Sequence, residues 1–329
     1  MTALLDIQGL QIDIDREDGP ARVVDGITLS LQQGESLGIV GESGCGKSLT
    51  MLSLVGLLPN RIRATGGSAG FAGRDLLKMN ARELRKVRGA EIGFIFQDPM
   101  TSLNPVMRIG DQIAEALIYQ KGMGKAAALA RAEELLALVG IPSPKQRMTT
   151  YPHELSGGMR QRVMIAMGLA GDPKLLIADE PTTALDVTIQ AQIVDLVREL
   201  KAKSDMSVVW ITHDLALIAG LADRIAVLYA GTVVEDAPVT EIFDRPTHPY
   251  TRGLLASLPT LSDQPMARLA SIAGTPPEPG RRPPGCPFAP RCSLAEPACA
   301  QAVPQLTAVP GSDPRHRVAC IVTTREGRA

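Results

Sequence analysis

One octapeptide, residues 41–48 (GESGCGKS), restricts the folds open to this chain more than any other feature. It fits the pattern G-x-x-x-x-G-K-[ST], in which backbone N–H groups converge on a phosphate, the lysine reaches the outer phosphates and the hydroxyl serves Mg²⁺. An apolar run at residues 37–40 precedes it and helix-forming residues 47–58 follow it, so the loop has the strand and helix that it requires. We therefore expect an α/β fold with a parallel sheet and a nucleotide site.

The expected nucleotide contacts are the loop residues and the residue after them: Gly41, Glu42, Ser43, Gly44, Cys45, Gly46, Lys47, Ser48 and Leu49. Lys47 is expected to act in catalysis as well as in binding, and the Ser48 hydroxyl is expected to hold Mg²⁺. Cys45 is a reactive residue type. Because no base is suggested near it, we interpret it as a small side chain at a variable loop position.

A second apolar run, residues 175–178, ends in the acid pair Asp179 and Glu180. Two adjacent carboxylates at a strand end permit separate roles: Asp179 to hold Mg²⁺, and Glu180 to orient or deprotonate an attacking water. The pair is also compatible with a plain solvated strand edge. The intact phosphate loop upstream favours the catalytic interpretation.

A third motif, residues 155–161 (LSGGMRQ), has no evident task inside a single subunit. A glycine-rich serine turn that leads into a helix is an anion site. Because this turn lies far along the chain from the phosphate loop, it suggests a nucleotide held between two copies of the fold.

The composition is that of a globular protein with one large α/β domain and an appendage, at 329 residues, 45% hydrophobic and 21% charged. A formal net charge of −1 and an aromatic content of 3% give no support for nucleic-acid binding. The chain starts without a basic and apolar leader, and no run reaches the roughly 18 apolar residues of a membrane helix. We therefore expect a soluble, cytosolic chain.

Hydrophobic periodicity divides the chain further. Alternation predicts an antiparallel pair of strands at residues 5–14 and 23–31, and helical spacing predicts helices at residues 113–119 and 126–139. Beyond them, strand-like and helical segments alternate at residues 175–178, 189–203, 208–211, 215–221 and 225–228. This alternation is typical of a parallel α/β architecture.

Taken in order, the phosphate loop, Gln97, residues 155–161, the acid pair, Asp186 and His213 resemble the nucleotide-binding subunit of an ATP-binding cassette (ABC) transporter. The resemblance spans most of residues 1–245. It implies an α/β P-loop NTPase fold of the ABC ATPase type, with a RecA-like core, an N-terminal antiparallel β-layer and an inserted helical subdomain. The implied domains are residues 1–258, with the helical subdomain at about 98–158, and a Cys- and Pro-rich C-terminal extension at 259–329.

The resemblance also assigns roles to residues. Gln97 would touch Mg²⁺ and the attacking water, His213 would contact the γ-phosphate, and Asp186, after Ala184 and Leu185, would lie at the dimer seam. The signature residues that would close over ATP held by the opposite subunit are Leu155, Ser156, Gly157, Gly158 and Gln161. The implied catalytic set is Glu180, His213, Gln97 and Lys47, and the implied Mg²⁺ set is Ser48, Gln97 and Asp179.

One position departs from the common ABC pattern. Where many members place an aromatic side chain that stacks on adenine, this chain has Arg22. A planar guanidinium can stack on a base, and a solvent-facing strand arginine is the alternative. The choice of ATP over GTP therefore depends on the resemblance.

Residues 97–105, 184–190 and 248–255 narrow the resemblance to the peptide and nickel importer branch. It implies an ATPase that powers uptake of di- or oligopeptides, or of a related small solute that the sequence does not identify. The implied partners are two membrane-spanning permease subunits, a paralogous ATPase or a second copy, and indirectly a solute-binding protein. The implied location is peripheral, on the cytoplasmic face of the inner membrane. The alternative is a soluble ABC-type ATPase that is not coupled to transport. Residues 248–255 could equally form a helix that docks the tail.

The tail carries Cys286, Cys292, Cys299 and Cys320, spaced C-x₅-C-x₆-C-x₂₀-C. Disulfides are disfavoured in a reducing cytosol, and the short C-x₂₋₄-C pairs of zinc sites are missing. Four thiolates on proline-rich loops can suit a [4Fe–4S] cluster. Spacing alone leaves the cluster, zinc and unligated thiols open.

Residues 285–292 resemble the C-terminal extension of peptide-importer ATPases, some of which hold such a cluster. The resemblance therefore implies [4Fe–4S], with zinc as the alternative. Arg281, Arg282 and Arg291 are close in sequence to the cysteines and could lower the pKa of the thiols, although a solvated basic face is the commoner explanation for such arginines. His316 is a further candidate ligand, for which a structural role is favoured.

Overall fold

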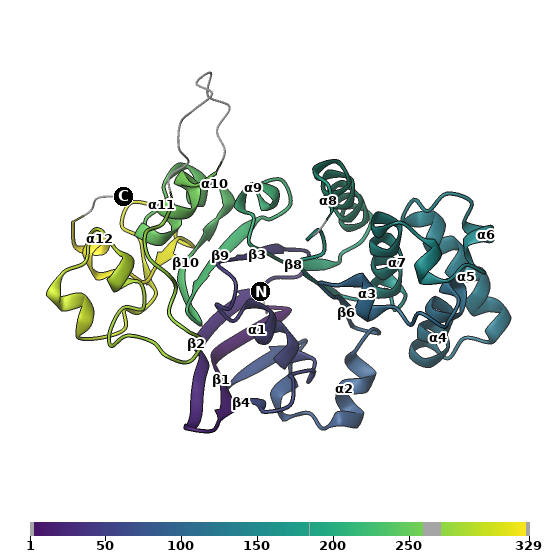
Figure 1. Ribbon diagram of the computed structural model, residues 1–329, viewed down its shortest axis with the longest axis horizontal. Helices are drawn as coiled ribbons and strands as arrows, with labels where there is room; N and C mark the ends of the chain where they lie inside the picture. Colours follow the sequence, from purple (N-terminus) through teal and green to yellow (C-terminus); the bar gives the residue numbers. More distant parts are fainter. Residues whose placement is uncertain (1–2, 184, 259–270, 327–329) are drawn as a thin grey trace, which may run out of the picture. The chain divides into compact units, whose positions relative to one another are not determined.

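The computed structural model describes residues 3–183, 185–258 and 271–326 (Figure 1). Ala184, part of the predicted dimer seam, lies outside the described residues, and so does part of the predicted C-terminal extension, residues 259–270 and 327–329. The described residues form two compact units: the first contains residues 32–35 and 78–211, and the second contains residues 3–31, 36–77, 212–258 and 271–326. These units differ from the predicted domains, whose boundary at residue 258 stays a prediction.

The first unit contains a parallel sheet in the order β6 (Ile92–Ile95), β7 (Leu175–Asp179) and β8 (Ser207–Thr212). Every residue of β7 and β8 is buried, as expected for parallel strands covered on both faces. The predicted strands at residues 175–178 and 208–211 are confirmed. The four-residue β6 was not predicted.

Helices make up the rest of the first unit. In chain order they are α2 (Ala81–Val87), α3 (Pro99–Ser102), α4 (Ile109–Lys121), α5 (Lys125–Leu138), α6 (Pro144–Arg147), α7 (Gly157–Leu169) and α8 (Val187–Ala202). α4, α5 and α7 pack against one another, which confirms the predicted helical middle region (Figure 1). α4 is followed by Gly122, whose φ of 66° is one that glycine adopts without strain.

α7 packs unusually closely on β6 in this unit. A Cβ on Gly93 of β6 would lie 2.2 Å from the carbonyl oxygen of Gly168 in α7, well inside van der Waals contact. A Cβ on Gly168 would lie 3.2 Å from Cγ1 of Ile95. Glycine at both positions therefore lets the backbones of the helix and the strand touch.

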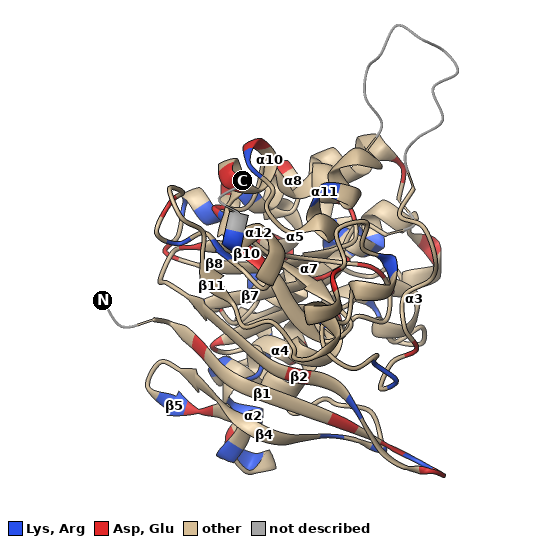
Figure 2. Ribbon diagram, turned by 90° about the vertical axis from the view of Figure 1, so that its left-hand side faces the viewer, with Lys and Arg blue, Asp and Glu red and all other residues tan. Residues whose placement is uncertain are grey.

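The second unit contains an antiparallel sheet in the order β2 (Gly19–Leu31), β1 (Leu5–Arg16), β4 (Ile62–Phe71) and β5 (Arg74–Asp75). Leu5 pairs with Leu31, which confirms the predicted pairing of the first two strands. Residues of both charge signs are interspersed along β1 and β2 (Figure 2), and Arg22 forms an ion pair with Asp13 across them.

The same unit contains a second set of strands. β3 (Ser36–Val40) runs parallel to β9 (Arg224–Tyr229), and β10 (Thr232–Pro238) pairs antiparallel with β9. β12 (Arg317–Val318) pairs with β10 and with β11 (Thr307–Ala308). The tail was predicted to be an appendage, but it contributes these last two strands because its backbone completes the hydrogen bonding of β10.

The helices of the second unit are short. They are α1 (Lys47–Leu54), α9 (Leu215–Ile218), α10 (Val239–Asp244), α11 (Pro249–Ala256) and α12 (Ile321–Glu326). α1 ends four residues before its predicted end, because the chain turns at Val55 and Gly56. The 3₁₀ turns in the described part of the chain are Leu76–Lys78, Pro152–Glu154, Ala289–Arg291 and Pro297–Ala300.

A buried polar network ties the tail to β10. Nε2 of His316, a fully buried side chain, lies 2.8 Å from the Glu235 carboxylate, and its Nδ1 lies 2.7 Å from the Ser312 hydroxyl. The structural role favoured for His316 is thus what the structure shows. Asp236 beside it accepts hydrogen bonds from Arg224 and Arg317.

Within the part of the chain that the structure describes, no helix combines the length and the apolar composition needed to cross a membrane.

Candidate functional site

The predicted phosphate loop joins β3 to α1 in the second unit. Gly46, which precedes α1, has a φ of 97°, in the region that favours glycine. A Cβ on Gly41 would lie 2.2 Å from the carbonyl oxygen of Leu228, so glycine is required there by the close approach of β9. The two motif glycines are therefore explained by the local backbone.

The Lys47 side chain lies inside the curve of this loop. It is 4% exposed, and its Nζ donates hydrogen bonds to the carbonyl oxygens of Gly41 (2.8 Å) and Glu42 (3.1 Å). The Cys45 sulfur lies 3.8 Å from the same Nζ, but burial raises the pKa of the thiol. A protonated, buried thiol agrees with the interpretation of Cys45 as a small loop residue rather than a nucleophile.

The acid pair ends β7 in the first unit. The Asp179 side chain is buried, and Glu180 follows it with a φ of 45°, a left-handed conformation that is uncommon for a residue with a Cβ. The Glu180 N–H donates to the carbonyl oxygen of Ile211 at the end of β8, over 3.0 Å. This bond holds the turn at the carboxyl edge of the parallel strands, where ligands of such sheets bind.

Gln97 and Glu180 meet at this edge. β6 and β7 are neighbours, with Ile95 paired to Ala178, so the residues just beyond both strands come together. Nε2 of Gln97 donates to the Glu180 carboxylate over 3.2 Å. Oγ1 of Thr183 donates to the same oxygen over 2.9 Å. Sequence reasoning missed Thr183, although its place three residues after Glu180 on a tight turn was a usable signal.

The signature motif forms the start of α7 in the first unit. Ser156 is its N-cap, and Oγ accepts a hydrogen bond from the Met159 N–H over 3.3 Å. Ser156 and Gly157 are exposed, whereas Leu155 is buried and so is Gln161. The buried side chains of Leu155 and Gln161 thus anchor the turn, while Ser156 and Gly157 face solvent.

α8 begins beside the signature. Asp186 is exposed and caps α8 by accepting from the Ile189 N–H over 2.9 Å. A Cβ on Gly158 would lie 3.0 Å from Cγ2 of Ile189, so the starts of α7 and α8 are in close contact. The structure therefore brings two predicted intersubunit motifs, 155–161 and Asp186, together on one unit.

Two other predicted residues occupy the second unit. His213 is exposed and directly follows β8. The Arg22 guanidinium donates to both oxygens of Asp13, over 2.8 and 3.2 Å, and lies 3.6 Å from Asp25. The alternative given for Arg22, a strand arginine, thus has identified partners, while stacking on a base stays a prediction.

The four tail cysteines line one small cavity in the second unit. Its volume is about 10 Å³, room for about one water molecule, and His248 and Phe288 also line it. All five cysteines of the chain are free of disulfides. Among the described residues, no three His, Cys, Asp or Glu side chains are spaced to hold a single metal ion.

The arginines near the cysteines do not activate them, so the less favoured of the two interpretations does not hold. Burial raises the pKa of the Cys286 and Cys292 thiols. Arg281 pairs with Glu278, Arg282 with Asp25 and Arg291 with Glu42. Their charges are directed at carboxylates, so Cys286 and Cys292 keep the raised pKa that burial gives them.

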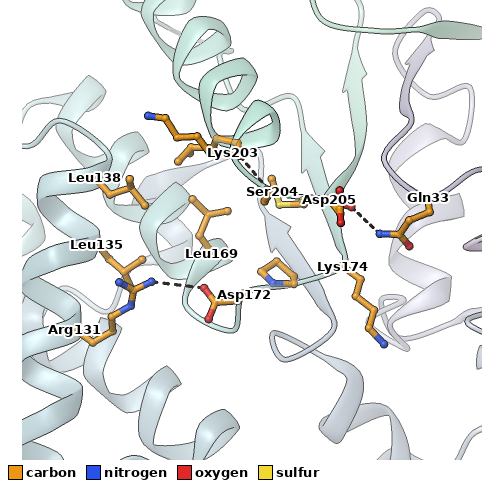
Figure 3. Close-up of a pocket in the computed structure, with 13 residues that line it drawn as sticks. Gln33, Arg131, Leu135, Leu138, Leu169, Asp172, Lys174, Lys203, Ser204 and Asp205 are labelled. Atoms are coloured by element: carbon orange, nitrogen blue, oxygen red, sulfur yellow. Dashed lines mark hydrogen bonds and ion pairs between the residues drawn. The ribbon is translucent and has the colours of Figure 1, made fainter.

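A separate, larger cavity of about 370 Å³ lies in the first unit (Figure 3). Leu135, Leu169 and Met206 contribute apolar walls, and Arg131 at the rim lies 3.6 Å from Asp172. None of the predicted site residues lines this cavity.

Comparisons with known proteins agree with these arrangements. The family described as "ABC transporter" matches residues 24–183, and the family described as "Oligopeptide/dipeptide transporter, C-terminal region" matches residues 234–299. The dipeptide transport ATP-binding protein of Bacillus subtilis is 50% identical over 308 residues, which cover 93% of this chain and 92% of that protein. This chain belongs to the ABC transporter ATPase family.

Other relatives extend the comparison. The oligopeptide transport ATP-binding protein of Bacillus subtilis is 52% identical over 298 residues, covering 90% of this chain and 83% of that protein. The oligopeptide transport ATP-binding protein of Salmonella typhimurium is 49% identical over 308 residues, covering 94% and 91%. The similarity to these ABC ATPases thus continues from the phosphate loop into the tail.

Solved structures of ABC ATPases share the fold. A dimeric ATP-binding cassette in a post-hydrolysis state, bound to ADP and phosphate, matches with a TM-score of 0.65 at 27% identity. The match covers 71% of this chain and 98% of that one. An ABC transporter component of Clostridium perfringens matches with a TM-score of 0.63 at 26% identity, covering 74% and 92%.

Proposed function

We propose that this chain is the ATP-hydrolysing subunit of an ABC importer for dipeptides or oligopeptides. The observation that carries the proposal is about 50% identity, over nearly the whole chain, to ATP-binding proteins named for dipeptide and oligopeptide transport. The match of residues 234–299 to the peptide-transporter C-terminal region supports the same solute class. A soluble ABC ATPase without a transport partner is the less favoured function.

In this function the loop N–H groups and Lys47 would bind the phosphates of ATP. Ser48, Gln97 and Asp179 are oxygen donors of the kind that Mg²⁺ prefers, and the buried Asp179 carboxylate is a fitting ligand. Bound Mg²⁺ would offset negative charge on the phosphates. Leu49 and Arg22 complete the proposed nucleotide contacts.

Glu180 would orient the attacking water. Gln97 and Thr183 both donate hydrogen bonds to one carboxylate oxygen of Glu180, Oε2. These two bonds fix the orientation of the carboxylate. His213 would contact the γ-phosphate. These roles make Glu180 the catalytic base or water-orienting residue, with Thr183 as its positioning residue.

The exposed Ser156 turn would close over ATP bound by a second ATPase subunit, with Asp186 at the seam. An exposed helix start is suited to an anion brought by a partner. We propose a paralogous ATPase as that partner, with a second copy of this chain as the alternative.

The assembly would also include two membrane-spanning permease subunits and, indirectly, a solute-binding protein. The helical subdomain at about 98–158 would receive the permeases beside Gln97. The subunit would then be peripheral, on the cytoplasmic face of the inner membrane, with its ATPase domain at 1–258 and its extension at 259–329.

The tail thiols fit an iron–sulfur cluster by donor type, because four cysteines line one cavity. The cavity has room for about one water molecule, so a [4Fe–4S] cluster would have to separate the cysteine loops. Anaerobically purified protein should be brown if the cluster is present. Colourless protein containing zinc would favour the alternative metal.

Reconstitution tests the transport function. The full chain is co-expressed with two membrane subunits and a solute-binding protein of a peptide importer, and uptake of a labelled dipeptide into ATP-loaded proteoliposomes is measured. We expect uptake that Lys47→Ala abolishes and Lys203→Ala, an exposed lysine, leaves intact. ATP hydrolysis by a chain that never co-purifies with membrane subunits would instead support the soluble ATPase.

A further inference from the structure

The tail reaches the phosphate loop through one arginine. Nη1 and Nη2 of Arg291 donate to the two carboxylate oxygens of Glu42, the second loop residue, over 2.7 and 3.0 Å. The two residues are 249 positions apart in the sequence. The Arg291 side chain is 5% exposed and that of Glu42 is 26% exposed, so this bidentate pair is shielded from solvent. Such charge-assisted pairs are the strong and geometrically specific ones.

Aromatic side chains fix both ends of this pair. The Glu42 N–H donates to the Tyr250 hydroxyl over 2.9 Å, and Nη1 of Arg291 donates to the Tyr229 hydroxyl over 3.2 Å. The guanidinium carbon lies 5.7 Å from the centre of the Tyr229 ring. Both the backbone and the side chain of Glu42 are therefore held by residues that lie outside the phosphate loop, Tyr250 and Arg291.

The arginine is adjacent in sequence to residues that line the thiol cavity, although it does not line the cavity itself. It directly precedes Cys292 and ends the 3₁₀ turn Ala289–Arg291. Phe288, which lines the cavity, packs its ring 5.2 Å from that of Tyr229 and 5.4 Å from that of Tyr250. A segment of seven residues, 286–292, thus carries two of the four thiols together with the group that holds the loop.

On the loop side, Glu42 contacts the lysine of the phosphate site. Its carbonyl oxygen accepts a hydrogen bond from Nζ of Lys47 over 3.1 Å. A continuous chain of contacts therefore runs from Cys292 through Arg291 and Glu42 to Lys47. A shift of the cysteine segment would move the carboxylate that Arg291 grips, and with it the loop carbonyl that the ammonium group touches.

We propose that Arg291 is a positioning residue that couples the thiol cavity to the phosphate loop, so that the arrangement of the four cysteines sets the affinity of the loop for nucleotide. The inference rests on the proposed function in one respect, that residues 41–48 bind ATP. Coupling of this kind is reciprocal: if the cysteine arrangement changes ATP affinity, ATP must change the state of the cysteines.

The first test measures binding of labelled ATP with Mg²⁺ to the full-length chain by equilibrium dialysis. We expect Arg291→Met to weaken binding about 10-fold, because the partly buried Glu42 carboxylate loses a charged bidentate partner. Arg291→Lys, which keeps the charge without the fork, should weaken it less. The control Arg315→Met removes an exposed tail arginine paired with Asp313 and should bind ATP as the wild type does.

The second test measures a property that a purely structural arginine would not affect. The reduced full-length chain is treated with iodoacetamide, with and without MgATP, and alkylation of Cys292 is followed by peptide mass spectrometry. We expect MgATP to slow alkylation of Cys292 severalfold in the wild type, because an ordered loop restrains Arg291. In Arg291→Met the rate should no longer depend on MgATP.

Wild-type ATP affinity in Arg291→Met, or ATP-independent alkylation of Cys292 in the wild type, would overturn the coupling and leave the nucleotide site standing. Unweakened binding in Lys47→Ala would instead remove the nucleotide site on which the inference depends. If circular dichroism shows that Arg291→Met is unfolded, Glu42→Gln takes its place, since it keeps the hydrogen-bonding shape and removes the charge. We expect it to weaken ATP binding and reduce the effect of MgATP on Cys292; unchanged values for both would also overturn the coupling.

Discussion

Glu180 combines an unusual backbone with a fixed side chain. A non-glycine residue in a left-handed conformation costs about 1–3 kcal/mol and persists where its surroundings hold it. Here the bond from its N–H to the Ile211 carbonyl and the donors Gln97 and Thr183 do so. This cost is consistent with a carboxylate whose direction matters for the reaction.

Replacing Glu180 with glutamine tests this role. Glu180→Gln keeps the shape of the side chain but cannot accept a proton, so we expect ATP turnover in the assembled transporter to fall at least about 100-fold, within the range of general-base effects. ATP binding should persist and favour a stable, closed ATPase pair. Turnover is measured as phosphate release and binding by equilibrium dialysis.

A matched control is Glu199→Gln on the exposed face of α8, where the side chain is 70% exposed. Its turnover should equal that of the wild type. Wild-type turnover in Glu180→Gln as well would remove Glu180 from the water-orienting role.

The sequence predicted the residues of the phosphate loop and of the acid pair, but not the side chains that hold them in place. Gln97 and Glu180 were both predicted, and their contact follows from adjacent parallel strands. Arg291 was weighed only against the nearby cysteines, since nothing local links it to Glu42, 249 positions away. Contacts of this range depend on the tertiary fold, which the local pattern does not contain.

The start of α11 shows how a short helix anchors the tail. His248 caps the helix, with Nδ1 accepting from the Tyr250 N–H over 3.1 Å, and its ring lies 5.8 Å from that of Phe288. This contact supports the alternative that residues 248–255 form a helix docking the tail. Burial lowers the pKa of His248 to about 4 from its usual value of 6.5.

This burial predicts a pH-dependent stability. The unfolded chain takes up a proton at His248 near pH 6.5 while the folded chain does so only near pH 4, so stability is full above pH 6.5 and is lost as the pH falls toward 4. Keeping His248 neutral in the folded chain therefore changes the free energy of unfolding by on the order of 3 kcal/mol between these two pH values. His248→Asn, which can still cap the helix, should flatten this part of the pH profile in urea unfolding followed by circular dichroism. An equally steep profile in both proteins would contradict the prediction.

The glycine that opens the phosphate loop should tolerate no side chain. Gly41→Ala would place Cβ against the Leu228 carbonyl, so we expect a loss of about 1–3 kcal/mol in unfolding free energy and weaker ATP binding. Gly124→Ala is the control, because a Cβ there meets nothing within 4 Å. Thermal unfolding and equilibrium dialysis measure the two effects. Equal melting temperatures in the two variants would show that the loop can move aside.

Elements with strong periodicity were predicted well, and the others were missed for physical reasons. β4 contains the run Ala64, Thr65, Gly66, Gly67, Ser68 and Ala69, which has little apolar pattern, and its strand is imposed by pairing with β1. β12 is only two residues long and exists because β10 offers it a free edge. Such strands depend on neighbours more than on their own sequence.

At the scale of the whole molecule, the exposed Ser156 turn predicts a site shared between subunits. If a second copy of this chain takes the place of the paralogous ATPase, MgATP should produce a dimer of the full-length chain in the Glu180→Gln background, seen by size-exclusion chromatography with light scattering. Adding Ser156→Arg should abolish the dimer, because a large cation replaces the turn that meets the partner's nucleotide. ATP binding to the monomer should remain, since the phosphate loop is unchanged.

Ser204→Arg, on the exposed stretch after α8, is the control for this experiment and should dimerise normally. Dimerisation of the Ser156→Arg variant would show that this turn takes no part in the contact. Absence of an ATP-dependent dimer in every variant would favour a paralogous ATPase as the obligatory partner.

The backbones of Gly93 and Gly168 are in direct contact, so the end of α7 near Gly168 has no room to move toward β6. Ser156 lies at the opposite end of this helix, about 18 Å from Gly168 at 1.5 Å per residue. A methyl group added at Gly93 or Gly168 would tilt α7. Because Ser156 is at the far end of the helix, a small tilt would displace it sideways by a larger distance. Gly93 and Gly168, neither of which is a predicted nucleotide contact, therefore set the position of Ser156, the residue proposed to meet the neighbouring subunit.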